Sequence, residues 1–318
     1  MTAVIETEGL RKEYRRLRGG STVAVDGLDL SVPEGGVFGF LGPNGAGKTT
    51  TIRCILGLVR PTRGSTRLLG AGSSTELAGS IRRVGSIVET PTMFPRFSGR
   101  KNLRLLARLY GIGPKAVDAV LDRVGLAGRA GDAVKTYSLG MKQRLGLAAA
   151  LLKDPVVLIL DEPANGLDPA GIKEVRELIR TLGAEGRTVF VSSHQLAEVQ
   201  QMCDRLAIIA KGRTVASGSV AEVLATGHGS RVIVRLADLA AGLEALRQAG
   251  FEATLEDDAI RVVIAPEAAA RVTETLARQG LYVSELRTDE VSLEDVFLEL
   301  TGGSNATPAA VPPPPPPS

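Results

Sequence analysis

Short apolar runs alternate with segments of helical periodicity along the first two thirds of the chain. Four of these runs are continuous in apolar residues: VFGFLG (37–42), VVLILD (156–161), TVFVSS (188–193) and RLAIIA (205–210). Runs of this kind are typical of strands buried on both faces of a parallel sheet. Apolar residues recur at helical spacing in three segments between them, 101–111, 142–153 and 172–183. The pattern predicts an α/β domain with a mostly parallel sheet over residues 1–228.

The pattern changes after the sequence TGHGS. Residues 229–302 contain four strand-like segments and two amphipathic helical ones in the order βαββαβ, followed by a closing helical segment, SLEDVFLELTG. This order predicts a small C-terminal ferredoxin-like α+β module. Residues 303–318 contain six consecutive prolines and cannot form a core, so we expect a disordered or polyproline II tail, with a ligand for a proline-binding module as the alternative.

Composition narrows the class of protein. Lys and Arg number 38 against 35 Asp and Glu, a net charge of +3, which is too small to indicate a nucleic-acid partner. Cys54 and Cys203 are the two cysteines, and we expect reduced thiols in a cytosolic protein. No apolar run reaches the roughly 18–20 residues that span a bilayer, so any membrane attachment is expected to depend on a partner.

The segment FLGPNGAGKTT contains the pattern G-x-x-x-x-G-K-[ST] directly after a predicted strand and before a predicted helix. Glycines let backbone N–H groups turn around a phosphate, and the helix N-terminus adds its dipole. Lys48 is expected to reach the β- and γ-phosphates and Thr49 to bind Mg²⁺. The segment therefore predicts a nucleoside triphosphate site, formed by Gly42, Pro43, Asn44, Gly45, Ala46, Gly47, Lys48, Thr49 and Thr50.

The segment VVLILDEP places two acidic residues at the end of an apolar strand. Asp161 is expected to hold the Mg²⁺ directly or through water, and Glu162 to orient or deprotonate the attacking water. An ordinary acidic strand end is the alternative. Together with the phosphate loop, the pair indicates hydrolysis rather than binding alone.

The segment YSLGMKQR precedes a long helical pattern. Residues 137–140 are expected to form a turn and the helix to begin at Met141. Ser138 and the free N–H groups of that helix then provide a second anion site, although a simple N-capped helix explains the same residues.

The segments GPNGAGKTT, SLGMKQR, LDEPANGLDP and SSHQLAEV, in this order, resemble the ATP-binding cassette of ABC transporters over about residues 4–225. The YSLGMKQRLGLA and VETPTMFP segments resemble the bacitracin-resistance and lantibiotic-immunity exporters, and the ending VFLELTG also fits the related drug exporters. The resemblance implies a P-loop cassette with a helical subdomain at about residues 90–153. It also implies that Tyr14 stacks on adenine, that Ser138, Gly140 and Asp168 act at a dimer interface, and that His194 senses the γ-phosphate.

The sequence departs from the commonest cassette pattern at two places. Leu139 and Met141 stand where most members have glycine and glutamine. Glu89 stands where most have a glutamine that links the metal site to the membrane partner, so we expect it to contribute to Mg²⁺ binding. A solvated loop acid is the alternative for Glu89.

The combined motifs predict the ATPase subunit of a bacterial exporter. The resemblance implies a head-to-tail homodimer at the cytoplasmic face of the membrane, with a separate integral membrane permease seated on the exposed segment PTMFPRF and no nucleic-acid partner. A soluble ABC ATPase acting on ribosomes or DNA, an importer ATPase and a P-loop kinase are the alternatives.

Overall fold

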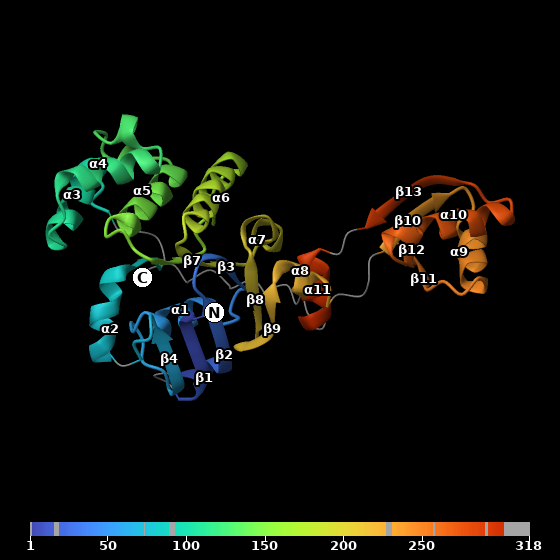
Figure 1. Ribbon diagram of the computed structural model, residues 1–318, viewed down its shortest axis with the longest axis horizontal. Coiled ribbons are helices and arrows are strands. Elements are labelled where there is room, and N and C mark those ends of the chain that lie inside the picture. The colour runs from blue at the N-terminus through green and yellow to red at the C-terminus, as the bar shows by residue number, and fades with distance from the viewer. Residues whose placement is uncertain are drawn as a thin grey trace, which may run out of the picture. The chain divides into compact units, whose positions relative to one another are not determined.

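The computed structural model describes residues 2–15, 19–72, 74–88, 93–226, 231–256, 258–289 and 292–301 (Figure 1). The chain divides into two compact units, of which the first ends at Ala225 and the second begins at Thr226. Each unit has its own hydrophobic core. The two units are therefore described separately.

A six-stranded sheet forms the centre of the first unit. Its strand order is β5 (Val84–Ile87), β6 (Val157–Asp161), β7 (Thr188–Ser193), β3 (Gly36–Leu41), β8 (Arg205–Ala210) and β9 (Arg213–Ser219). Five strands run parallel, and β9 pairs antiparallel with β8. The four apolar runs are thus confirmed as strands, and the ring of Phe190 in β7 packs against those of Phe38 and Phe40 in β3.

A separate antiparallel sheet was not expected from the sequence. It has the order β2 (Ser21–Pro33), β1 (Ala3–Arg15) and β4 (Arg63–Leu68). Gly9, with a φ of 53°, lies where the β1–β2 register shifts between Thr7 and Leu10. Such bulges interrupt the alternation of apolar and polar residues by which a strand is recognised. The apolar face of this sheet shares one core with α1 (Lys48–Ile55) and the six-stranded sheet.

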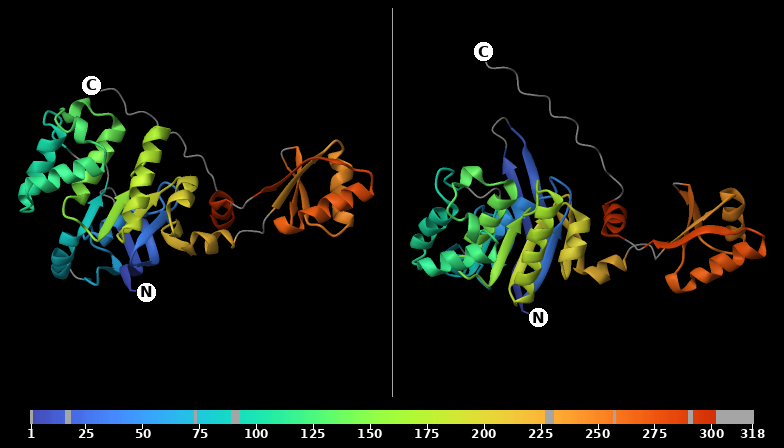
Figure 2. Two further views of the ribbon diagram at one scale, coloured as in Figure 1. Left: turned by 45° about the horizontal axis from the view of Figure 1, so that its top comes forward. Right: turned by 90° about the horizontal axis from the view of Figure 1, so that it is seen from above.

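Helices occupy the remaining surface of the first unit. Figures 1 and 2 show α3 (Gly99–Leu109), α4 (Pro114–Arg123) and α5 (Leu139–Leu151) gathered in one cluster. The other helices are α2 (Ser74–Ser80), α6 (Pro169–Ala184), α7 (Leu196–Met202) and α8 (Val220–Leu224), with 3₁₀ turns at Ile81–Arg83, Ala127–Arg129 and Val134–Thr136. Helix α6 packs against β3 and β7, so it covers the strands that end at the phosphate loop and at His194.

The second unit has the order of elements expected from its sequence. It comprises β10 (Arg231–Leu236), α9 (Leu239–Gln248), β11 (Ala253–Glu256), β12 (Ala259–Val263), a 3₁₀ turn (Pro266–Ala268), α10 (Ala269–Arg278), β13 (Val283–Asp289) and α11 (Leu293–Thr301). The sheet is antiparallel with the order β11-β12-β10-β13. Val232 and Val234 of β10 pack with Leu246 of α9 and Leu276 of α10, so both helices cover the same face of the sheet.

Candidate active site

The loop between β3 and α1 has a backbone that only glycine fits well. Gly45 has a φ of 83° and Gly47, the N-cap of α1, a φ of 106°. A Cβ on Gly47 would lie 2.4 Å from the Ala24 carbonyl oxygen, and one on Gly42 would lie 2.6 Å from the Ile209 carbonyl oxygen. The loop therefore winds tightly from the end of a central parallel strand into a helix N-terminus, where the first N–H groups lack intrahelical acceptors.

This loop borders a cavity of about 400 Å³, a size that suits a small-molecule ligand. The residues that line it are Ala24, Pro43, Asn44, Gly45, Gly47, Lys48, Thr49, Thr50, Glu162, Asn165 and His194. Two of the predicted loop residues, Gly42 and Ala46, support the loop instead. The Gly42 carbonyl accepts a hydrogen bond from Lys48, and the Ala46 carbonyl accepts one from the Gly212 N–H.

Lys48 lines the cavity, and its ammonium group is bound by a carbonyl oxygen and a carboxylate. Its Nζ donates to the Gly42 oxygen at 2.7 Å and lies 3.2 Å from Oε1 of Glu162, and the side chain is 6% exposed. A buried ammonium group needs such acceptors, because leaving it without a partner would cost several kcal/mol. The arrangement leaves a cation next to the loop amides, as anion binding requires.

The end of β6 brings Glu162 to the same cavity, whereas Asp161, the residue before it, is not among those that line it. Asp161 is buried, and its Oδ1 accepts a 2.5 Å hydrogen bond from the Ser192 hydroxyl of β7. Glu162 follows with a φ of 49°, a backbone conformation that is costly for a residue with a side chain and often marks a functional site. Its Oε2 lies 2.7 Å from His194 Nδ1. The structure thus brings Lys48, Glu162 and His194 into one chain of contacts.

The residues near the loop suit a hard divalent cation. Among the described residues no cluster of three or more His, Cys, Asp or Glu side chains is arranged to hold a metal. Thr49, which lines the cavity, and Asp161, which ends β6, nevertheless carry oxygen atoms of the kind that Mg²⁺ binds, and Mg²⁺ is commonly bound by one or two protein oxygens together with nucleotide phosphates. Glu89, the third predicted metal residue, lies outside the described residues.

Four other predicted residues do not line this cavity. Ser138 caps α5, and the expectation that this helix begins at Met141 is wrong: it begins at Leu139, because the Ser138 hydroxyl accepts from the Met141 N–H at 3.2 Å. Asp168 caps α6 by accepting from the Gly171 N–H at 3.1 Å. These two residues are exposed on the first unit, as is Tyr14 of β1; the fourth, Gly140, is half-buried in α5.

Sequence reasoning missed three residues of the site. Ala24 and Asn165 line the cavity, and Asn165 could have been found because it follows the acidic pair in LDEPANGLD. Ser192 donates to Asp161 and accepts from the Glu162 N–H at 3.0 Å. Nothing in the local sequence points to Ser192, because its role depends on the pairing of β6 with β7.

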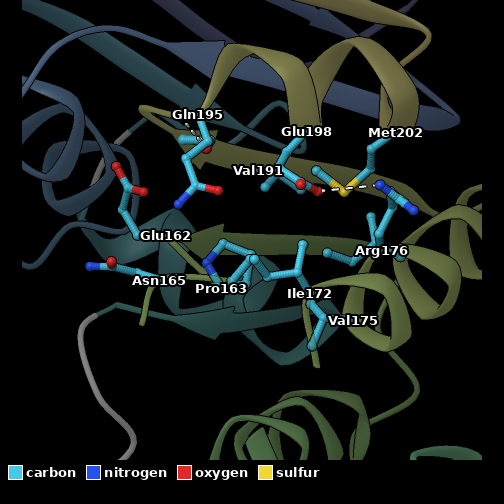
Figure 3. A pocket seen from close by; sticks show the side chains of 13 residues that line it. Glu162, Pro163, Asn165, Ile172, Val175, Arg176, Val191, Gln195, Glu198 and Met202 are labelled. Carbon is cyan, nitrogen blue, oxygen red and sulfur yellow. Dashed lines mark hydrogen bonds and ion pairs between the residues drawn. The ribbon is translucent and has the colours of Figure 1, made fainter. Parts of the chain in front are cut away.

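A second, much smaller cavity adjoins Glu162 between α6, α7 and β7 (Figure 3). Its volume is about 20 Å³, room for about one water molecule. Apolar side chains such as Ile172, Val175 and Met202 form its walls, and Arg176 faces Glu198 across it at 3.5 Å. This crevice separates the helix that follows Glu162 from the helix that follows His194.

Residues 25–165 match the family described as ABC transporter. The chain is 42% identical to the ABC transporter ATP-binding protein YhcH of Bacillus subtilis, over 95% of this chain and 97% of that protein. This chain belongs to the ABC transporter family. The chain is also 40% identical to the bacitracin transport ATP-binding protein BcrA of Bacillus licheniformis, over 95% of this chain and 99% of the relative.

Other relatives of this ABC protein carry related names. The daunorubicin/doxorubicin resistance ATP-binding protein DrrA of Streptomyces peucetius is 37% identical over 95% of this chain and 93% of its own length. The solved structure of cbiO1 from Clostridium perfringens, part of the ABC transporter complex cbiONQ, superposes with a TM-score of 0.63 and 28% identity over 71% of this chain and 92% of that one. The chain is therefore an ABC-type ATPase, and these names concern transport or resistance rather than ribosomes or DNA. Within the described ranges, no helix combines the length and apolarity needed to cross a bilayer.

Proposed function

We propose that this chain is the ATPase subunit of a bacterial exporter for a peptide antibiotic, a drug or a similar cargo. The observation that carries the enzymatic part is the meeting of Lys48, Glu162 and His194 at the phosphate-loop cavity. The names of the bacitracin and daunorubicin/doxorubicin relatives support export as the purpose of the hydrolysis.

Lys48 and the loop amides bind the β- and γ-phosphates of ATP. Thr49 and Asp161 would hold Mg²⁺, which neutralises phosphate charge when it is bound. Tyr14 stacks on the adenine ring. The ammonium group of Lys12 lies over the Tyr14 ring, 5.0 Å from its centre, and leaves the other face of the Tyr14 ring for the adenine. This ordering of the triphosphate aligns the γ-phosphorus with a water molecule beside Glu162.

Glu162 orients that water and accepts its proton as the water oxygen bonds to the γ-phosphorus and the bond to ADP breaks. His194 holds Oε2 of Glu162 at 2.7 Å, while Lys48 lies 3.2 Å from Oε1. Phosphate oxygens compete with Glu162 for Lys48, so nucleotide binding frees Oε1 for the water. The same contact keeps the carboxylate occupied when no nucleotide is bound.

Two copies of the chain form a head-to-tail dimer in which each ATP lies between one chain's phosphate loop and the other chain's Ser138 and Gly140. The support is that Ser138 and Asp168 are exposed helix caps that do not line the cavity of their own chain. A helix N-terminus with a hydroxyl cap suits a γ-phosphate. Asp168 lies in the loop that crosses the dimer interface.

A separate integral membrane permease binds the surface near the start of α3. Phe94 is 61% exposed, its ring centre lies 5.3 Å from that of Phe97, and Met93 is half-buried beside them. Phe97 is half-buried, so Phe94 is the exposed member of the pair, and exposed apolar groups that cluster are typical of protein interaction sites. This contact would hold the ATPase at the cytoplasmic face of the membrane. We propose no nucleic-acid partner.

The second unit is proposed to be a ferredoxin-like accessory module over residues 229–302, attached to a cassette of residues 1–228 with its helical subdomain at about 90–153. The strand order β11-β12-β10-β13 and the two helices on one face support this assignment. Residues 303–318, which lie outside the described residues, are proposed to be a solvated proline-rich tail.

Two experiments test the function. Glu162→Gln should bind ATP, accumulate as an ATP-dependent dimer in size-exclusion chromatography, and hydrolyse ATP at least about 100-fold more slowly than wild type. Full turnover of this variant would remove Glu162 from the mechanism. Tagged protein purified from mildly solubilised native membranes should retain an integral membrane protein at comparable amount, whereas recovery with ribosomes or DNA would refute the exporter.

A further inference from the structure

The first residue of α5, Leu139, touches the loop that leads from Glu162 to α6. Its Cδ2 lies 3.1 Å from the point where a Cβ on Gly166 would sit, and Gly166 has a φ of 73°. The next residue, Gly140, stands close to Leu167, whose Cδ2 is 3.9 Å from the corresponding point. These two close approaches of a leucine side chain to a glycine, here named the Leu139 clasp, bring together two loops that are distant in sequence.

The Leu139 clasp lies between the N-terminus of α5 and the loop that lines the ATP cavity. On one side is Ser138, the exposed cap of α5. On the other side is the short loop whose Glu162 and Asn165 line the ATP cavity and whose Asp168 caps α6. A displacement of that loop would therefore act directly on the N-terminus of α5 through the Leu139 side chain.

An ion pair also connects α5 with α6. Arg144 of α5 lies 3.4 Å from Glu174 of α6, about one and a half turns beyond each N-terminus. Because Glu174 is more than half exposed, this ion pair is screened by water and contributes little by itself. The clasp is the apolar part of the connection, and 43% of Leu139 remains exposed, so the contact can be altered without opening a core.

We propose that Leu139 is a positioning residue that couples the two ATP sites of the dimer, an inference that rests on the head-to-tail arrangement proposed above. In that arrangement Ser138 and Gly140 contact the partner's nucleotide, while Glu162 and Asn165 contact the nucleotide of their own chain. The clasp makes both loops move together, so that occupation of one site favours closure and hydrolysis at the other. Such coupling between sites is a difference in free energy between two linked states.

The test compares three variants of the full chain in steady-state ATPase assays over a range of ATP concentrations. Leu139→Ala removes the Cδ atoms that approach the glycine, and the alanine it introduces is the best helix former, so the start of α5 is preserved. Leu139→Met keeps an apolar chain of similar volume. Leu109→Ala, at a leucine of α3 that is 79% exposed, controls for the loss of a surface leucine from the same helical cluster.

For Leu139→Ala we expect kcat to fall about fivefold and the Hill coefficient for ATP to fall from about 2 to about 1. Binding of a fluorescent ATP analogue to the single chain, measured at concentrations below dimer formation, should stay within about twofold of wild type. Leu139→Met should keep the wild-type kcat and Hill coefficient, and Leu109→Ala should change neither.

The outcomes separate this inference from the proposed function. Three results would each overturn the coupling role. The first is an unchanged kcat and Hill coefficient in Leu139→Ala, and the second is a Leu139→Met variant whose kcat and Hill coefficient are as low as those of Leu139→Ala. The third is a wild-type Hill coefficient of about 1. Ser138→Ala, measured in parallel, reports on the composite site itself. If Ser138→Ala is inactive while Leu139→Ala is normal, the dimer site stands and only the clasp fails; if Ser138→Ala is fully active, the composite site fails.

Discussion

Replacing Ser192 by alanine removes one hydroxyl that holds both acidic residues at the end of β6. The Ser192 side chain is fully buried; its Oγ donates to Asp161 at 2.5 Å and accepts from the Glu162 N–H at 3.0 Å. The Glu162 N–H keeps a second acceptor, the Ser192 carbonyl oxygen at 3.2 Å. The substitution therefore leaves the strand end paired but takes the only hydrogen-bond donor described for the Asp161 side chain.

The magnitude follows from the charge and burial of the acceptor. A hydrogen bond to an ionised group contributes about 1.5–3 kcal/mol, and Asp161 is only 8% exposed, so water replaces the lost donor poorly. For a domain of this size a loss of about 2 kcal/mol lowers Tm by about 4–8 °C. Residues that orient a metal ligand typically affect metal affinity or activity by about 10–100-fold, so the Mg²⁺ concentration for half-maximal ATPase activity should rise by a factor in that range.

The assay measures thermal unfolding and the Mg²⁺ dependence of ATP hydrolysis on the same preparations. Thr188→Val is the matched control, because Thr188 is buried in the same strand and its hydroxyl accepts from the Gly35 N–H at 2.7 Å, far from Asp161 along β7. This control should also lower Tm, since it leaves the partly buried Gly35 N–H without its acceptor. Its Mg²⁺ dependence should match that of wild type.

The reasoning is refuted if Ser192→Ala loses stability but keeps the wild-type Mg²⁺ dependence. In that case the hydroxyl would support only the pairing of β6 and β7, and Asp161 would hold its position without it. An equal Mg²⁺ shift in Thr188→Val would also refute it, because the effect would then come from general loosening of the sheet.

Two further predictions concern surfaces away from the cavity. Phe94→Ser should abolish co-purification of the membrane permease while leaving the ATPase rate of the isolated subunit unchanged; retained co-purification would exclude this aromatic pair as the docking site. Asp26→Asn should lower Tm at about pH 7 and have a smaller effect at about pH 3.5. The reason is that the hydrogen bond from Arg213, at 2.6 Å, lowers the pKa of Asp26, so its stabilisation is present above the unfolded pKa and is lost as the pH falls through the folded pKa. Glu177→Gln, at a weak exposed pair, should show no such dependence.

The parts of the fold that depend on local sequence were predicted well. Apolar runs such as 156–161 and 188–193 became the expected strands. The glycines of the phosphate loop also behave as their local sequence implies. The antiparallel sheet of β1, β2 and β4 was missed because its register is interrupted at bulges and its partners are distant in the chain. The start of α5 was placed two residues too late, because the hydroxyl of Ser138 caps the helix and lets it begin at Leu139.

By itself, the sequence determined the loop that can hold phosphates and the residue types that can hydrolyse ATP, because a tight turn, a helix N-terminus and an acidic strand end are properties of neighbouring residues. Only the tertiary structure decided which of these groups meet. Lys48, Glu162 and His194 follow three different strands, β3, β6 and β7, and they converge because these strands are parallel neighbours whose carboxyl ends share one edge. Strand order is fixed by packing between segments distant in the chain, so the contacts of Ser192 and Leu139 could be found only in the folded structure.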